Sequence, residues 1–411
     1  MFFLLKFAFR NVLRNRRRTI LSGLSIMFAV MIVIYMWSFI MGMMGDVVDL
    51  FVQSTSGHIR VVNTEYLKRE KMLPLNKNIA NYQKVLDVVE KTAGVKLVTP
   101  RIKFGVLMER EGKNKPVFGI GIDPQKEEQA MNFSKKIIEG RPIMMGKEEA
   151  NVGALFARDF GLKVGDTLTV VTQTAHGSIS AMNLKVAGIF SFGAAAIDRR
   201  TFYMPIDKAQ YLLDIPNRVT EIFVLLKNEN KAPMIAAMLD KKINASGALK
   251  YKARAWQEQG FVFLWMMMAK YIYMTIYAII LFFASFTILN TMFMAVMERA
   301  KEIGMMKAMG MRNSQVKGVV LLEAAIIGFF ASMIGAFLGG AISYGLSVAG
   351  IAFGGGMEGV DMAIPMVMYG KFSLFYIFVG FLMGILFSII AAIFPALRAA
   401  KFEPAEALRE I

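Results

Sequence analysis

The chain of 411 residues is 55% hydrophobic, carries a formal net charge of +17 and contains no cysteine. This hydrophobicity is too high for a soluble protein, because the apolar residues are gathered into long runs, and the missing cysteines exclude disulfides and thiolate chemistry. Much of the basic charge flanks the apolar runs, so it indicates anionic lipid head groups, rather than nucleic acid, as a partner.

Residues 1–19 predict a helix that lies on the membrane surface. Lys6, Arg10, Arg14 and Arg17 fall on one helical face of this segment and apolar side chains on another, as in basic amphipathic helices of the membrane interface. Residues 20–45 carry no charge and are long enough to cross a hydrocarbon core of about 30 Å. Because the run is too long for a signal peptide and lacks a cleavage pattern, we expect it to be the first transmembrane helix.

Residues 46–260 predict a large α+β domain. Strands are predicted at 58–62, 95–98, 106–109, 117–122, 167–171, 184–189 and 221–226, and helices at 80–92 and 234–243. The sequence NVGALFARDFGLKVGD at 151–166 predicts a helix, a tight turn at Gly165 and Asp166, and a strand.

Three more spans are predicted after this domain. Residues 261–297 would extend about 55 Å as one helix, so we expect the first dozen to stand outside the bilayer as a stalk. Residues 318–348 form the third span, in which Ala331, Gly335 and Gly339 recur every fourth position. Such small residues let transmembrane helices pack closely and offer a face to a second permease copy. Residues 373–395 form the fourth span.

The basic residues orient the spans. The N-terminal segment, residues 298–317 and the tail at 396–411 are basic and adjoin span ends, so the positive-inside rule places them in the cytoplasm. The α+β domain and the loop at 349–372 are then outside. The predicted fold class is a membrane α-helical protein with four transmembrane helices and a large α+β extracytoplasmic domain inserted between helices 1 and 2.

A charged segment, MERAKEIGMMKAMGMRNSQ at 297–315, joins the second and third spans. As a helix it places Ala300, Gly304, Ala308 and Met311 on one stripe, where another surface could approach the backbone. Two interpretations remain open: a docking helix for a partner, and a solvated basic loop.

Candidate catalytic chemistry is sparse. The chain contains no G-x-x-x-x-G-K-[ST] phosphate loop, so we expect it not to hydrolyse ATP itself. His58 and His176 lie far apart without a zinc-binding context. The 33 methionines are typical of adaptable apolar packing rather than of a soft-metal path, so neither a catalytic nor a metal site is predicted.

Two polar residues fall inside predicted spans, Glu323 and Asn290. Such residues are functional candidates by default. For Glu323 we prefer the plainer interpretation, in which its carboxylate pairs with an Arg or Lys of the charged segment.

Four segments resemble the FtsX-like permease family, the membrane subunits of ABC transporters that include lipoprotein-releasing and macrolide-efflux permeases. They are FRNVLRNRRRTILSGLSI (9–26), NVGALFARDFGLKVGD (151–166), MERAKEIGMMKAMGM (297–311) and PALRAAKFEPAEALRE (395–410). The third and fourth are the specific ones, and together with the four-span layout they cover the chain from end to end.

The resemblance implies that residues 298–312 form a coupling helix that docks on a separate ATPase subunit, and that 404–408 belong to the family's cytoplasmic tail. The coupling residues implied are Glu298, Arg299, Lys301, Glu302, Gly304, Lys307, Ala308 and Gly310. ATP and Mg would be bound by that ATPase, and no cofactor by this chain. A second permease copy or paralogue completes the implied assembly in the bacterial inner membrane, with both termini cytoplasmic.

The family's mechanism is mechanotransmission, in which ATP-driven movement of the coupling helices reaches the outer domain. The resemblance favours extraction of lipoproteins, with a lipoprotein or a periplasmic chaperone as a further partner. The hairpin TQTAHGSISAM at 172–182 is shorter than the proline-containing hairpin of chaperone-binding members. An efflux permease with an outer-membrane partner and a regulator of an envelope hydrolase therefore remain alternatives.

Overall fold

The computed structural model describes residues 2–14, 16–110, 113–244, 251–352 and 365–403. The chain divides into two compact units. The described residues within 1–44, 267–351 and 368–411 build a helical membrane unit, and those within 45–266 and 352–367 build an α+β domain. The predicted tail at 404–408, and residues 353–364 of the predicted outer loop, lie outside the described residues.

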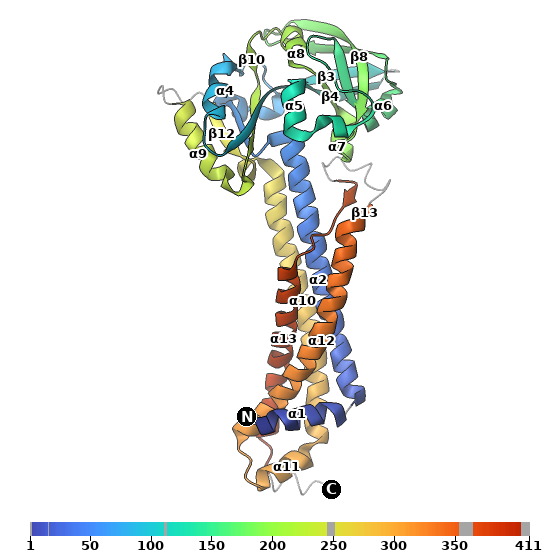
Figure 1. Ribbon diagram of the computed structural model, residues 1–411, viewed down its shortest axis with the longest axis vertical. Helices are drawn as coiled ribbons and strands as arrows, with labels where there is room; N and C mark the ends of the chain where they lie inside the picture. The colour runs from blue at the N-terminus through green and yellow to red at the C-terminus, as the bar shows by residue number, and fades with distance from the viewer. Residues whose placement is uncertain (1, 15, 111–112, 245–250, 353–364, 404–411) are drawn as a thin grey trace. The chain divides into compact units, whose positions relative to one another are not determined.

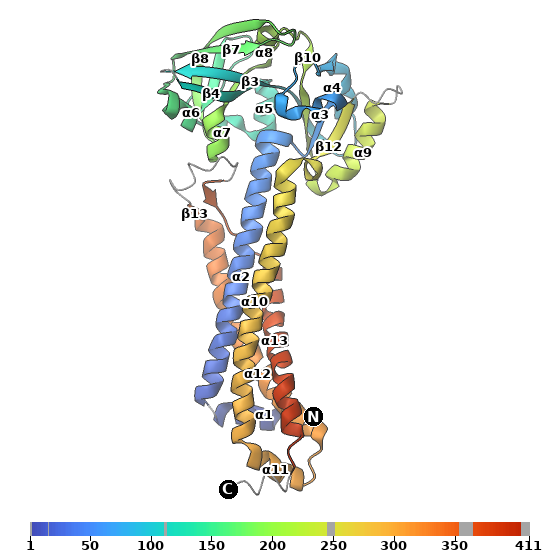
Figure 2. The same ribbon diagram turned by 180° about the vertical axis from the view of Figure 1, so that it is seen from behind.

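Long helices form the membrane unit (Figure 1). They are α2 (Arg16–Phe51), α10 (Gly260–Glu298), α12 (Asn313–Ala349) and α13 (Leu374–Ala400), with the shorter α1 (Phe2–Arg14) and α11 (Ala300–Ala308). Among the described residues, four helices are long and apolar enough to cross a membrane, which confirms the four predicted spans. The four long helices run side by side, and α1 and α11 lie at the same end of the bundle (Figures 1 and 2).

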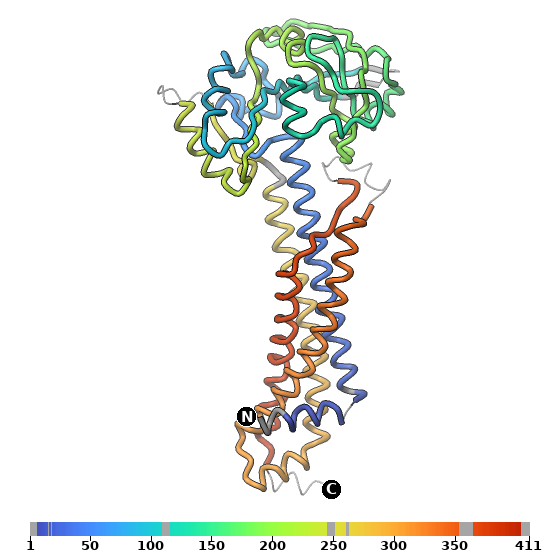
Figure 3. Tube along the Cα trace, in the orientation of Figure 1, coloured from blue at the N-terminus to red at the C-terminus, as the bar shows by residue number. Residues whose placement is uncertain are grey.

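Helix boundaries differ from the predicted span boundaries. The predicted surface helix at 1–19 ends at Arg14, and α2 already begins at Arg16. The coupling helix implied at 298–312 is shorter, because α11 covers only Ala300–Ala308 and α12 begins at Asn313. The Cα trace turns back between these two helices (Figure 3). Hydropathy marks where a helix enters lipid, whereas charged residues with good helix propensity continue the helix beyond that point.

The small-residue stripe of α12 is filled by the chain's own helices. A Cβ on Gly335 would lie 2.5 Å from the carbonyl oxygen of Met27 in α2, and one on Gly339 would lie 3.1 Å from that of Met31. The close approach predicted for this stripe is therefore confirmed. Its proposed use as a face for a second permease copy is wrong, because α2 occupies it.

The α+β domain is built on one ten-stranded sheet with the order β12-β1-β11-β3-β4-β9-β6-β8-β5, in which β7 also pairs with β8. The strands are β1 (Ile59–Asn63), β3 (Val95–Arg110), β4 (Lys113–Ile122), β5 (Ile137–Gly140), β6 (Glu149–Gly153), β7 (Thr167–Gln173), β8 (Ile179–Phe190), β9 (Thr201–Pro205), β11 (Glu221–Leu226) and β12 (Tyr251–Ala255). Two short pairs stand outside it, β2 (Ile79–Ala80) with β10 (Arg218–Val219) and β13 (Ile351–Ala352) with β14 (Val367–Met368).

Seven helices accompany the sheet. They are α3 (Thr64–Lys68), α4 (Tyr82–Glu90), α5 (Pro124–Met131), α6 (Ala154–Phe160), α7 (Ala195–Arg200), α8 (Ile206–Leu213) and α9 (Ala232–Ile243) among the residues described. The helix, turn and strand predicted at 151–166 are present, with Gly165 at φ 99°, although residues 151–153 belong to β6. The strands predicted at 95–98 and 106–109 are one strand, because β3 runs without a break from Val95 to Arg110. Its first part pairs with β11 and its second part with β4.

His58 lies half-buried just before β1. Its Nδ1 accepts a hydrogen bond from the backbone N–H of Leu226 at 2.9 Å. Burial lowers the pKa of His58 below 6.5, although the carboxylate of Glu229, 3.8 Å away, raises it. The folded domain therefore holds this imidazole neutral at a pH where the unfolded chain binds a proton.

We expect the α+β domain to lose stability in mild acid. The pKa of His58 is lower in the folded domain than in the unfolded chain, so its contribution to the free energy of unfolding is complete above about pH 6.5. Below that pH the contribution falls, by at most about 1.4 kcal/mol per pH unit. His58→Gln should flatten urea unfolding midpoints between pH 7 and 5.5. His176→Gln, at an exposed position, is the control, and an unchanged pH profile in His58→Gln would contradict the assignment.

Candidate functional site

The candidate site is α11 with the side chains that tie it to other helices. α11 begins after Arg299 and ends at Ala308. Gly310 has φ 97°, a left-handed conformation that glycine adopts without strain. It turns the chain back toward α12. The side chains concerned, called the α11 network below, are Asn11, Arg14, Arg299, Glu302, Lys307 and Glu323.

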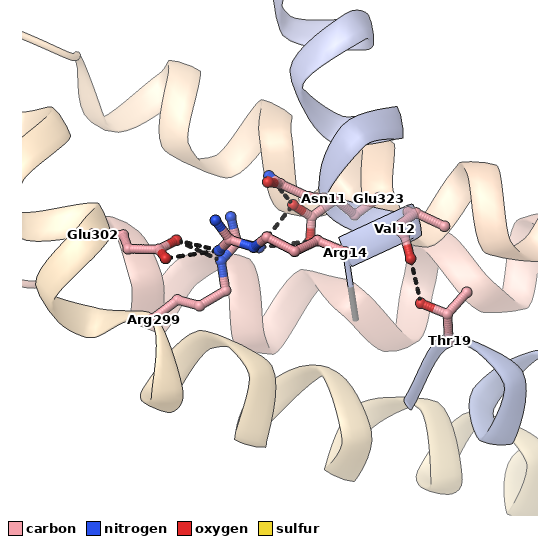
Figure 4. Close-up of polar contacts among 7 residues, drawn as sticks. All are labelled: Asn11, Val12, Arg14, Thr19, Arg299, Glu302 and Glu323. Atoms are coloured by element: carbon pink, nitrogen blue, oxygen red, sulfur yellow. Dashed lines mark hydrogen bonds and ion pairs between the residues drawn. The ribbon is translucent and has the colours of Figure 1, made fainter. Parts of the chain in front are cut away.

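The buried part of the network joins α1, α12 and the start of α11 (Figure 4). Arg299 Nη1 donates to Glu323 Oε1 at 3.0 Å, and the Asn11 amide donates to the same oxygen at 2.7 Å. Glu323 and Asn11 are both buried. The pairing predicted for Glu323 with a basic residue of the charged segment is confirmed. Asn11 was not predicted, because its helix was assigned to the lipid surface.

The exposed part of the network joins α11 to α1. Glu302 accepts hydrogen bonds from Arg14 Nη2 at 2.7 Å and from Arg299 Nε at 3.0 Å. Burial lowers the pKa of Arg299, but the carboxylates of Glu323 and Glu302 outweigh it and raise that pKa above its ordinary value. Burial likewise raises the pKa of Glu302, and the two arginines outweigh it and lower that pKa. These contacts therefore persist at neutral pH.

Lys307 ties α11 to the end of α13. Its Nζ donates to the carbonyl oxygens of Ala400 at 2.9 Å and of Phe402 at 2.6 Å. The last carbonyls of a helix lack intrahelical partners and carry partial negative charge. The ammonium group thus stabilises this helix terminus, and in this structure Lys307 contacts its own chain.

Gly304 also faces the protein interior. It is buried together with Ile303, so the predicted stripe is not an open surface along its whole length. The outward side chains of the segment are Lys301, Met305, Ala308, Met309 and Arg312, with Gly310 beside them. Met309 is 81% exposed and Met305 48%. Two exposed methionines four residues apart, flanked by basic residues, suit contact with another protein surface. The sequence prediction did not single them out.

The remaining predicted residues lie elsewhere. Glu298 is the last residue of α10, and Asn290 is exposed on the same helix, away from the buried Glu323. The structure thus does not bring the two predicted intramembrane polar residues together. Within the described ranges, no group of three or more His, Cys, Asp or Glu side chains could hold a metal ion.

Comparison with known proteins adds family relationships. A model of the FtsX-like permease C-terminal region matches residues 274–404, and a model of the MacB-like periplasmic core domain matches residues 19–242, more than half of the chain. LolC of Neisseria meningitidis, a lipoprotein-releasing system transmembrane protein, is 22% identical over 345 residues, which are 80% of this chain and 81% of that protein.

Two further similarities are to another permease and to a crystal structure of a periplasmic region. An uncharacterised ABC transporter permease of Methanocaldococcus jannaschii is 22% identical over 416 residues and covers 99% of this chain and 97% of its own. The crystal structure of the periplasmic region of MacB from Actinobacillus actinomycetemcomitans matches with a TM-score of 0.36 at 13% identity, over 55% of this chain and 95% of that one. That score is too low to support an argument.

Proposed function

Because the chain belongs to the family of FtsX-like permeases that carry a MacB-like periplasmic core domain, we propose that it is the membrane subunit of a mechanotransmitting ABC transporter. A separate ATPase subunit binds ATP and Mg²⁺ and docks on α11. The chain resides in the inner membrane with α1, α11 and both termini on the cytoplasmic side, and works with a second permease copy or paralogue.

The arrangement of α11 carries this proposal. One side of the helix is bonded to α12 through Arg299, to α1 through Glu302 and to α13 through Lys307. The other side presents Met305 and Met309 to the outside. A solvated basic connection between two spans would need neither the bonds to three helices nor the exposed methionines. A partner that pushes on the exposed side would move three helices together.

Transport in this mechanism takes place outside the bilayer. Movement of α11 passes into α10 and α12, which directly precede and follow it, and along these helices to the outer face of the membrane. Polar groups lining a pore through the spans are not required, because the substrate is handled by the α+β domain or in the outer leaflet.

Lipoproteins are the substrate class that we propose. The support is the 22% identity of the chain to LolC, a lipoprotein-releasing system transmembrane protein. The β7–β8 hairpin, whose turn is closed by a hydrogen bond from Thr174 N–H to the Ser178 carbonyl at 2.8 Å, places Ile179 82% exposed beside it. An exposed apolar residue on a hairpin offers a contact for a lipoprotein or a periplasmic chaperone.

Met309→Asp should release the ATPase subunit. An aspartate in a contact that was apolar leaves an unpaired charge at the interface, and retention of the ATPase on the tagged permease during affinity purification should fall at least about tenfold. Met72→Asp, at an equally exposed methionine of the α+β domain, is the matched control. Because the chain contains no cysteine, Met309→Cys also gives a single site for cross-linking. Full ATPase retention by Met309→Asp would refute docking through this face.

Identification of the co-purified proteins tests the substrate class separately. Purification of the wild-type chain in mild detergent should bring down the ATPase together with a lipoprotein or its chaperone. An efflux adaptor or an envelope hydrolase in its place would overturn the lipoprotein proposal and leave the docking of the ATPase intact.

A further inference from the structure

A groove lies between the end of α1, the start of α2 and the end of α10, apart from the buried side of the α11 network. Its volume is about 790 Å³, and it is lined by Arg14, Arg16, Arg17, Leu21, Asn290, Thr291, Met294 and Glu298. We propose that this groove binds the head group and upper acyl chains of an anionic phospholipid. The proposal does not depend on the ATPase partner.

The charge of the groove selects an anion. Three of its eight lining residues are arginines, and one, Glu298, is acidic. A guanidinium binds a phosphate through two parallel hydrogen bonds. Arg16 and Arg17 lie three and two residues before Thr19, where the apolar span begins, and they therefore stand at the level of the lipid phosphates.

The wall of the groove selects an amphiphile over a free anion. Leu21 is 59% exposed and Met294 60% exposed, so apolar surface continues from the arginines toward the span. Ser22 donates to Thr291 Oγ1 at 2.7 Å, which holds α2 and α10 together beneath it. Asn290, an exposed amide within a span, can donate to a phosphate or glycerol-ester oxygen.

A second copy of the chain fits this groove less well than a lipid does. In a symmetric contact it would bring its own three arginines to the same level, and like charges would oppose each other. An anionic lipid neutralises the arginines and covers Leu21 and Met294 at once. Its phosphate would also compete with Glu302 for Arg14, which already bonds that carboxylate.

Native mass spectrometry of the full chain in detergent tests the site. We expect one tightly bound phosphatidylglycerol, displaced poorly by phosphatidylcholine with the same acyl chains. Each basic residue near an anionic lipid contributes roughly fivefold in affinity, so Arg16→Gln with Arg17→Gln should weaken binding roughly 25-fold. Lys6→Gln with Arg10→Gln removes the same charge from exposed positions of α1 outside the groove and should change affinity less than about twofold.

Leu21→Trp keeps every charge but fills the apolar wall, and should also weaken phosphatidylglycerol binding several-fold. Equal losses in the two double variants would mean attraction to the basic N-terminal segment as a whole and would overturn the site. Displacement of the lipid by millimolar inorganic phosphate would show a simple anion site. Cross-linking of Leu21→Cys between two copies in detergent would assign the groove to a dimer contact. Either of these last two results would also overturn the proposal.

Discussion

Replacing Arg101 with methionine is expected to destabilise the α+β domain by about 3–5 kcal/mol, because it leaves a buried carboxylate without its partner. Arg101 lies on β3 and is 1% exposed. Its guanidinium forms an ion pair with the equally buried Glu127 of α5, and Thr99 Oγ1 donates to the same carboxylate at 3.1 Å. The guanidinium also stacks over the ring of Phe223, 3.6 Å from its centroid.

Arg101 has a second set of partners at the end of α2. Its Nη1 donates to the carbonyl oxygen of Ser54 at 3.2 Å, and its Nη2 to that of Gln53 at 3.4 Å. Both residues lie in the helical turn at Val52–Ser56 that directly follows α2. The terminal carbonyls of a helix carry partial negative charge, so Arg101 holds the end of the first long helix inside the domain.

Two variants separate these roles. Arg101→Met with Glu127→Leu removes both charges and should recover most of the lost stability, since an apolar replacement of a buried ion pair is often close to neutral. It cannot restore the donors to Gln53 and Ser54. Hydrogen exchange of peptides covering Val52–Ser56 should therefore be faster in the single and in the double variant.

The matched control is Lys68→Met. Lys68 pairs with Glu65 in the same domain, but the two side chains are 66% and 53% exposed, so its loss should leave stability almost unchanged. Equal unfolding midpoints for Arg101→Met and Lys68→Met would rule out the special weight given to the buried pair. Unchanged exchange in Val52–Ser56 would rule out the attachment of α2.

Features set by local chemistry could be predicted from the sequence. Lipid excludes water, so a span must show a long uncharged run, and all four spans were found from hydropathy. The spacing of Gly335 and Gly339 predicted a close helix contact, which the structure has. Glu323 could be paired with a basic residue of the charged segment because a carboxylate at the start of a span needs a counter-ion nearby.

Features set by distant partners could not be predicted. Glu127 lies 26 residues from Arg101 in the sequence, and Ser54 lies 47 residues from it. Helical or strand periodicity does not predict a contact between residues so far apart. The orientation of Gly304 had the same limit, because the face that a short helix buries depends on which neighbours cover it. Asn11 was assigned to lipid since the amphipathic pattern of its helix shows a polar face but not a polar partner.

Glu323→Leu is expected to uncouple ATP hydrolysis from transport and to leave the ATPase bound. The change removes the buried partner of Arg299 and strands the Asn11 amide, which is 6% exposed. Breaking such a pair costs about 3 kcal/mol or more. α12 would then be joined to α11 through the backbone at 309–312 and through the apolar packing of Ile303 with Val316 and Val320, without a polar tie. Substrate release per ATP hydrolysed should fall at least about tenfold, since about 1.4 kcal/mol already corresponds to a factor of ten.

Glu302→Gln is the matched comparison, because it removes a carboxylate of the same network at a 42% exposed side chain. An exposed pair contributes less than about 1 kcal/mol, so coupling should fall less than about fivefold. The contribution of the exposed Glu302 pair to coupling should depend on salt. Raising the salt concentration should weaken wild-type coupling toward the Glu302→Gln value, since screening acts over about 8–10 Å at physiological ionic strength. The buried pair of Glu323 should respond little to salt.

Retention of the ATPase decides what the Glu323 result means. Met305 and Met309 are untouched in Glu323→Leu, so affinity purification should recover the ATPase subunit in wild-type yield while transport is lost. Loss of both would mean that α11 itself has unfolded and that the variant says nothing about transmission through α12. Full transport by Glu323→Leu would show that α12 follows α11 without this ion pair, and that the movement reaches the outer face through α10 instead.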